Sequence, residues 1–253
     1  MTGITGYAER AHHYAAEIAR VPQPRLLADL LRPGHRVAEL PSATGHFLRA
    51  YSAASAEVTL IDACTEILEA ALRQADHHSL RQLRIVCCRI QDLSPEIGPI
   101  DLAVVPNAAL NQLAAETDPG GLLTAAAQIL APGGLLLTQV LFADDYRTTT
   151  SCGFYDPAVT DGTWLIDRRL TADDGRPLVR RRRQHRDSDR LHIDFELIRD
   201  GELVYTHGVD LRLLAFSDIE MAAATARATL VEITPGHGGL HEVLIAPATG
   251  NSQ

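Results

Sequence analysis

The chain has 253 residues, of which 46% are hydrophobic and 22% charged, and its formal net charge is −9 at pH 7. This length supports a large core, either as one domain or as a domain with an inserted cap, and the composition is that of a globular protein. The acidic balance argues against nucleic-acid partners, and the lack of a long apolar run or a basic-then-apolar leader predicts neither a membrane span nor secretion.

The first 20 residues are predicted to form a helical lead-in. Aromatic and small residues recur in it at helix-compatible spacing, at Tyr7, Ala11 and Tyr14. His12 and His13 are adjacent, so only one of them can face inward as a candidate base. A second helix is expected from Pro22 to Leu31, where an Arg-Pro-Gly turn ends it.

Residues 36–62 predict a nucleotide-binding βαβ unit. A short strand ends in Glu39, and a loop of small residues from Pro41 to Gly45 leads into a helix over residues 46–54. A second strand follows and ends at Asp62. Small residues allow the backbone to approach a ligand at a helix N-terminus, and an acid at the tip of the next strand can accept both hydroxyls of a ribose.

The α/β pattern continues to about residue 142. Its expected elements are a helix over residues 65–78, a strand over 83–88, a strand over 101–105, a helix over 121–130 and a strand from 135, preceded by a Pro-Gly-Gly turn. The uninterrupted apolar run after Asp101 is typical of a parallel strand that is covered on both faces. The four cysteines (Cys64, Cys87, Cys88 and Cys152) show no metal-type spacing, which predicts buried free thiols in a reducing cytoplasm.

Residues 146–216 predict an antiparallel β insert. Four β-type runs, separated by Asp- and Gly-containing turns, cover residues 163–170, 178–186, 191–198 and 203–214. Strand alternation divides the run from Arg180 to Arg183 between two faces, so we expect a solvated ladder of charge pairs with Asp194 and Glu196 rather than a nucleic-acid patch. Its exposed edge offers a surface through which two chains could pair.

The chain then returns to α/β. A helix with a Ser217 or Asp218 cap is expected to extend to Ala228, and strands are expected over residues 230–234 and 241–246. His237 and His241 are interpreted as loop and edge residues rather than as catalysts.

This order of elements resembles the class I S-adenosylmethionine (SAM) dependent methyltransferases. The resemblance rests on Glu39 to Gly45, on Asp62, on the strand that starts at Asp101, and on the Leu-Ala-Pro-Gly-Gly phrase at residues 130–134. Pro41 and Ala43 stand where the family has glycines. The resemblance implies an α/β fold, namely a doubly wound, seven-stranded Rossmann-like sheet with an antiparallel β insert after strand five.

The resemblance also implies a site. The cofactor would be SAM, with Asp62 at the ribose, Asp92 at the adenine, and Glu39, Thr44 and Gly45 near the methionine arm. The complete set of expected cofactor-binding residues is Tyr14, Glu39, Pro41, Thr44, Gly45, Asp62, Ala63, Gln91, Asp92 and Asn107. The expected catalytic residues are His13, Tyr14 and Asn107, no metal is expected, and the aromatic side chains Phe154, Tyr155 and Trp164 are candidate walls of the substrate pocket.

The expected organisation is a helical lead-in over residues 1–34, a SAM-binding core over 35–145, a β cap over 146–216 and a completing helix and hairpin over 217–253. The expected reaction is methyl transfer to a small-molecule metabolite. Because Pro41 and Ala43 alter the loop, two alternatives stay open: a SAM-consuming enzyme that reacts at the aminobutyrate arm and releases methylthioadenosine, and a non-catalytic partner protein.

Overall fold

The computed structural model describes residues 21–75, 82–143, 158–172 and 174–248, together with residues 11, 13, 14, 17, 78, 80 and 154–156. Ala11, His13, Tyr14 and Glu17 are helical. Tyr7, His12 and Cys152 lie outside the described residues. Within the described part of the chain, no helix is long and apolar enough to span a membrane.

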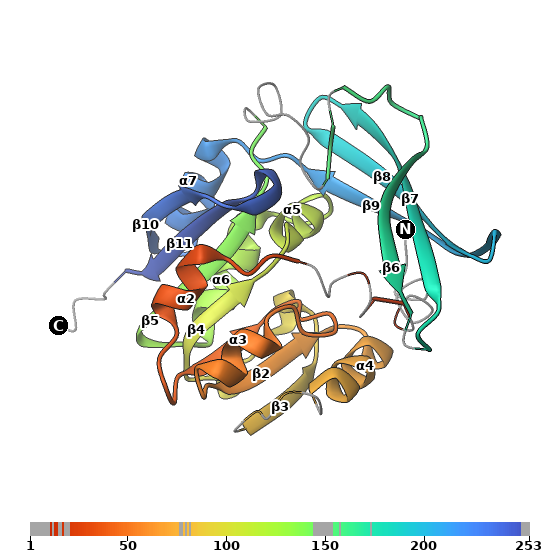
Figure 1. Ribbon diagram of the computed structural model, residues 1–253. Coiled ribbons are helices and arrows are strands. Elements are labelled where there is room, and N and C mark those ends of the chain that lie inside the picture. Colours follow the sequence, from red (N-terminus) through yellow and green to blue (C-terminus); the bar gives the residue numbers. More distant parts are fainter. Residues whose placement is uncertain are drawn as a thin grey trace.

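The larger of two sheets has seven strands in the order β10-β11-β5-β4-β1-β2-β3 (Figure 1). Its strands are β1 (Arg36–Glu39), β2 (Glu57–Asp62), β3 (Gln82–Cys87), β4 (Ile100–Val105), β5 (Leu130–Val140), β10 (Ala228–Pro235) and β11 (His241–Pro247). The five strands from β1 to β5 pair in parallel, whereas β11 lies antiparallel between β5 and β10. The predicted doubly wound, seven-stranded Rossmann-like sheet is confirmed.

Helices cover both faces of this sheet because successive strand residues point to opposite sides. On one side, Val37 and Val104 pack with helices α2 (Arg25–Leu30), α3 (Leu48–Ala53) and α4 (Thr65–Ala75). On the other side, Ala38 and Val105 pack with α5 (Ala109–Ala114), α6 (Pro119–Gln128) and α7 (Phe216–Thr225). Short 3-10 turns complete the layers at η1 (Ile90–Asp92), η2 (Pro95–Ile97) and η4 (His237–Gly239).

Several predicted boundaries were wrong. Helix α5 was missed because residues 107 and 108 reverse the chain with positive φ although neither is glycine. Helix α6 begins at Pro119, where the Asp118 carboxylate caps the N–H of Gly121 at 2.9 Å. The Ala-Pro-Gly-Gly stretch belongs to the irregular start of β5, where the register with β4 shifts. Helix α7 begins after Ala215, whose N–H donates to Asp218.

The second sheet stands beside the first and contains four antiparallel strands (Figure 1). These strands are β6 (Leu165–Thr171), β7 (Pro177–Asp187), β8 (Arg190–Arg199) and β9 (Glu202–Arg212). They match the four predicted β-type runs. The inner face of this meander packs on the carboxyl ends of the parallel strands: Leu191, Ile193 and Phe195 share an apolar cluster with Ala108 and Leu141.

The arginine run of β7 divides between two faces, as alternation predicts. On the outer face, Arg181 pairs with Glu196, and Arg183 with Asp194 at 2.7 Å. On the inner face, Arg180 and Arg182 are 6% and 4% exposed, so the expectation of a solvated ladder was wrong for these two. Arg180 pairs with Asp167 and, at 2.9 Å, with Glu17 of the N-terminal helical residues.

The two faces predict different mutational costs. Arg180→Ala would leave the buried carboxylates of Glu17 and Asp167 without their main partner, and the loss of one member of a buried pair costs about 3–5 kcal/mol. Arg181→Ala removes an exposed pair and should cost less than about 1 kcal/mol. Urea unfolding of both variants measures the difference, and equal losses would contradict this assignment of faces.

Candidate functional site

In the loop between β1 and α3, most backbone N–H groups donate to other groups of the protein. Pro41 has no N–H, and it follows Leu40 through a cis peptide bond. Four of the backbone N–H groups that follow it form internal bonds: Ser42 N–H to the Ile61 carbonyl (2.8 Å), Ala43 N–H to Asp62 (3.0 Å), Gly45 N–H to the Ser42 carbonyl (2.8 Å) and His46 N–H to Glu39 (2.6 Å). The loop is therefore tied to both neighbouring strands.

Glu39 is the main anchor of this loop. Its carboxylate is fully buried and accepts from the N–H of His46 (2.6 Å), the N–H of Phe47 (3.3 Å) and the hydroxyl of Tyr51 (2.7 Å), and His46 Nδ1 lies 3.2 Å away. Burial, followed by the charge and hydrogen bond of Glu39, raises the pKa of Tyr51 well above its ordinary value. The structure thus uses Glu39 to shape the loop.

Asp62 lies at the tip of β2, directly beside the loop. Asp62 is 9% exposed, and its two carboxylate oxygens accept from the N–H groups of Ala43 and Cys64, each at 3.0 Å. Burial raises the pKa of Asp62 even though these hydrogen bonds act to lower it. The backbone of Ala63 also acts on this carboxylate, and because an ionised carboxylate offers about four acceptor positions, capacity remains for a ligand.

Gly45 and Ala43 both adopt left-handed backbone conformations, with φ of 84° and 49°. A Cβ at Gly45 would lie 2.6 Å from the side chain of Leu48, so this glycine is required by close packing as well as by its φ. Ala43 makes the same kind of turn with a Cβ, which it buries against Ala11, Cys64 and Ile67. The alanine at the family's glycine position is therefore accommodated by packing.

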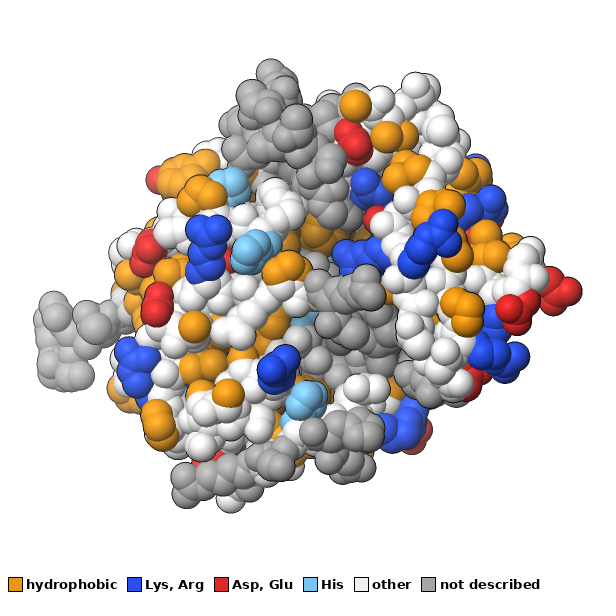
Figure 2. All heavy atoms as spheres, viewed as in Figure 1, with side chains coloured by type: hydrophobic (Ala, Val, Ile, Leu, Met, Phe, Trp, Pro, Cys, Tyr) orange, Lys and Arg blue, Asp and Glu red, His pale blue; other side chains and the backbone are white. Residues whose placement is uncertain are grey.

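The helical residues near the N-terminus lie between the loop and the meander. Ala11 packs on Ala43, and the ring of Tyr14 meets that of His46 edge-on at 6.4 Å. On the opposite side, His13 lies 6.0 Å from the ring of Tyr205, and Glu17 pairs with Arg180. The predicted catalytic residues His13 and Tyr14 thus lie between the two sheets. Figure 2 shows a hollow between the two sheets on this face, with apolar and basic side chains at its wall.

The other predicted residues follow the same edge of the sheet. Asn107 is half-buried with φ of 51°, and its N–H donates to Gln139 at 2.9 Å. Asn111 is fully buried and bonds both backbone groups of Leu141, so its amide is used within the fold. Asp92 is exposed at the end of η1. Gln91 Nε2 donates to Thr117, and Ala63 is half-buried beside Asp62.

The aromatic residues of the meander differ from the expectation. Trp164 lies under the guanidinium groups of Arg181 and Arg183, at 5.4 and 4.9 Å, so it is on the outer face and the prediction that it lines a pocket was wrong. The inner face instead presents a stack in which His207 lies 4.9 Å from Phe195 and 5.4 Å from Tyr205. Because successive strand residues alternate between the two faces of a sheet, counting from the arginine run of β7 could have placed these rings on the inner face. Phe154 and Tyr155 pack against the inner apolar cluster.

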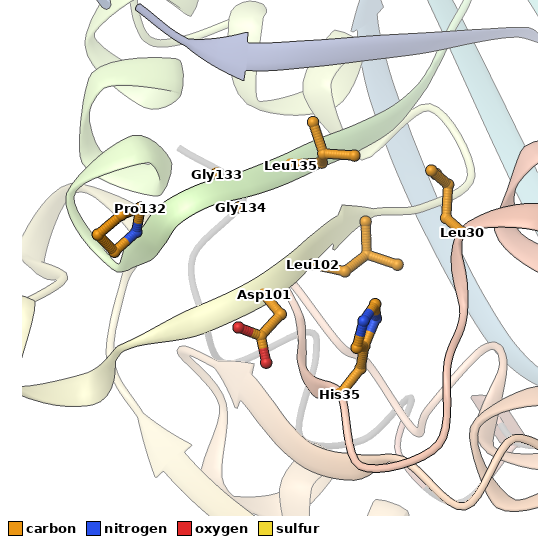
Figure 3. A pocket seen from close by; sticks show the side chains of 8 residues that line it. All are labelled: Leu30, His35, Asp101, Leu102, Pro132, Gly133, Gly134 and Leu135. Atoms are coloured by element: carbon orange, nitrogen blue, oxygen red, sulfur yellow. The ribbon is translucent and has the colours of Figure 1, made fainter. Parts of the chain in front are cut away.

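A cavity of about 300 Å³ opens at the opposite edge of the sheet (Figure 3). It is lined by Leu30, His35, Asp101, Leu102, Pro132, Gly133, Gly134 and Leu135. These residues lie at the amino ends of the parallel strands, whereas ligands of open α/β sheets bind at the carboxyl ends. Asp101 is engaged by the guanidinium of Arg36 at 2.6 Å. We therefore assign the candidate site to the carboxyl edge at Asp62.

Residues 37–134 match the protein family described as "Methyltransferase domain". This region runs from β1 to the first residues of β5. The fold is similar to that of the CcbJ methyltransferase from Streptomyces caelestis, with 17% identity over 97% of this chain and 99% of that one, and a TM-score of 0.73. No curated protein matches the sequence significantly.

Two further solved structures share the fold. One is a SAM-dependent methyltransferase from Clostridium acetobutylicum, with 15% identity, coverage of 95% of this chain and 98% of that one, and a TM-score of 0.67. The other is SAM-bound CalS10, an amino pentose methyltransferase from Micromonospora echinaspora, with 17% identity, coverage of 96% and 95%, and a TM-score of 0.62. At these identities the likeness establishes the fold alone.

Sequence reasoning missed His46 at the candidate site. It comes directly after the glycine of the loop, and its side chain is 4% exposed beside Glu39. The signal was a polar residue at the entrance of α3. Sequence reasoning also misplaced one thiol: Cys64 is buried as expected, whereas Cys87 is exposed and donates weakly to the Ala63 carbonyl at 3.8 Å.

Replacing Glu39, the anchor of the loop between β1 and α3, should destabilise the fold. Glu39→Gln keeps the size of the side chain but turns one acceptor into a donor that faces N–H and O–H groups. A buried polar group left unsatisfied costs about 1–3 kcal/mol, so we expect a loss of that order or more in the free energy of unfolding. Denaturant unfolding measures it, and unchanged stability would contradict the anchoring role.

Asp62 predicts a pH dependence. Because its pKa is raised in the fold, the ligand-free folded protein binds this proton more tightly than the unfolded chain. The stabilisation is complete below the ordinary Asp pKa and is lost as pH rises through the raised value. The melting temperature of wild type relative to Asp62→Asn should therefore fall as pH rises above the ordinary Asp pKa. A difference that stays constant with pH would contradict the raised pKa.

Proposed function

We propose that this chain is a SAM-dependent methyltransferase that acts on a small-molecule acceptor. The single observation that carries the proposal is Asp62, a buried carboxylate at the tip of β2 with two backbone bonds and spare acceptor positions. Ionised carboxylates are costly to bury without partners. Two ribose hydroxyls would supply the missing donors and repay that cost.

The residues around Asp62 fit an adenosine-bearing cofactor. We propose that Asp92 and Gln91, on the turn after β3, lie at the adenine, where a carboxylate can accept from the exocyclic amine. Thr44 and Gly45 lie on the loop toward which the amino-acid arm would extend, and Tyr14 covers the loop from the N-terminal side. Pro41, Ala63 and Asn107 complete the proposed lining, and Glu39 acts by holding the loop in place.

The cofactor supplies an electrophilic methyl group on a sulfonium. Transfer of this group is an in-line displacement, so the protein must mainly align the acceptor and exclude water. We assign this positioning to His13 and Tyr14, which lie between the loop and the inner face of the meander. His13 can also take a proton from an acceptor that must lose one.

The proposed acceptor site lies under the inner face of the meander. The stack of Phe195, His207 and Tyr205 offers flat apolar surfaces with polar tips, which suits a compact ring-bearing metabolite. CalS10 is an amino pentose methyltransferase, which makes an amine or hydroxyl of a small metabolite the acceptor group to test first. A cytoplasmic location and pairing of two chains at the meander edge stay predictions.

Cofactor binding tests the proposal. Asp62→Ala removes a charged acceptor from two ligand hydroxyls, and hydrogen bonds to charged groups contribute about 1.5–3 kcal/mol, so the Kd for SAM measured by calorimetry should rise at least about tenfold. Asp174→Ala, at an exposed turn of the meander, is the matched control and should leave the Kd unchanged. A wild-type protein that gives no heat with SAM would contradict the proposal and favour a non-catalytic role.

Product analysis separates the two enzymatic reactions. Incubation with SAM and a panel of small amines and alcohols should yield S-adenosylhomocysteine together with a methylated acceptor. Methylthioadenosine as the main product would instead show attack within the aminobutyrate arm. Mass spectrometry distinguishes these products directly.

A further inference from the structure

The loop from Pro41 to His46 offers a ligand few backbone donors. In a glycine-rich loop, backbone N–H groups point toward the ligand. Here Pro41 has no N–H, and the N–H groups of Ser42, Ala43, Gly45 and His46 are used within the protein, which leaves only that of Thr44, among the described donors of the loop, for a ligand. Contacts to a polar ligand at this loop must therefore come mainly from side chains.

Two buried side-chain atoms of the loop are available for this. Thr44 is fully buried, and its hydroxyl has no hydrogen-bond partner among the described residues. The side chain of His46 is 4% exposed, and its Nε2 likewise has no partner in the described part of the chain. Buried polar atoms without partners are rare and costly in native proteins, so each of them points to a group that arrives with a ligand.

The Glu39 contact fixes which kind of group His46 can bind. Glu39 accepts hydrogen bonds, so in the imidazole tautomer that donates to it the proton is on His46 Nδ1, 3.2 Å away. Nε2 then holds a lone pair and accepts from an N–H or O–H donor. Glu39 also takes bonds from Tyr51 and from the backbone of Phe47, which hold the carboxylate, and through it the imidazole, in a single orientation.

The charges around His46 favour a cationic donor. Glu39, at the end of β1, is fully buried, and Asp62, at the end of the neighbouring strand β2, is 9% exposed and accepts from Ala43 of the same loop at 3.0 Å. From the N-terminal segment, the ring of Tyr14 approaches the imidazole at 6.4 Å. Two buried carboxylates attract an ammonium group and repel a carboxylate.

We infer that His46 Nε2 accepts a hydrogen bond from the ammonium group of the cofactor's amino-acid arm, with the Thr44 hydroxyl as the second contact to the same arm. In this protein, hydrogen bonds from side chains take the place of the backbone N–H donors that a glycine-rich loop offers, since Pro41 and Ala43 stand at two of the glycine positions. The inference rests on the proposed function, since it takes SAM as the ligand, and it assigns to His46 a binding role in addition to its bond with Glu39.

Two substitutions at His46 separate that bond from the proposed one to the ammonium group. The shorter amide of His46→Asn can still donate to Glu39 but cannot reach the position of Nε2, whereas His46→Gln restores a polar atom near that position. By calorimetry we expect His46→Asn to raise the Kd for SAM about tenfold, the effect of one hydrogen bond to a charged group, and His46→Gln to recover most of the loss. Thr44→Val should weaken binding in the same direction, and Thr44→Ser should restore it.

A second probe identifies the bound group. Methylthioadenosine carries the adenosine but has no amino-acid arm, so its Kd should be the same for wild type and His46→Asn. His185→Asn, on the exposed outer face of β7, is the matched control and should change neither Kd. Melting temperatures of all variants show whether each one is folded.

The outcomes are distinct. If His46→Asn binds SAM as wild type does, or if it weakens methylthioadenosine as much as SAM, the inference is overturned while the proposed function stands. If wild-type protein binds methylthioadenosine but not SAM, the arm has no site here, and both the inference and the proposed function are overturned. If wild type binds neither, the proposed function fails as well.

Discussion

The site depends on the buried carboxylate of Glu39. Four donors converge on it, from the backbone of His46 and Phe47, the ring of His46 and the hydroxyl of Tyr51. A buried charge is tolerated only when it is bonded in this way. The bonds fix the turn that leads from β1 into α3. This turn places the N–H of Ala43 where it donates to Asp62. One interaction therefore sets both the shape of the loop and the position of the acid beside it.

The N-terminal helical residues connect the two sheets. Ala11 is buried against the loop, while Glu17 is buried against Arg180 of the meander. Because both contacts are made within six positions of the chain, the segment cannot leave the loop without disturbing the meander. The region between the sheets, where His13 and Tyr14 lie, is thus closed by a segment that depends on both of them.

The individual strands and the meander were predictable from local periodicity, and the seven-stranded sheet was implied by the family resemblance that residues such as Asp62 carry. The interactions that complete the site were not, because they join residues far apart in sequence: Glu17 and Arg180 are separated by 163 positions. The face on which Trp164 lies depends on the β6–β7 register, which shifts between Ile166 and Arg168. The role of His46 depends on the conformation of its loop, which a proline and an alanine at glycine positions concealed.

A crystal structure of the protein soaked with SAM tests the central claim most directly. The account predicts density for the ligand at the carboxyl edge of the parallel strands, with both ribose hydroxyls within hydrogen-bond distance of the Asp62 carboxylate. Density in the cavity beside His35 and Asp101, or side chains filling the space at Asp62, would contradict it.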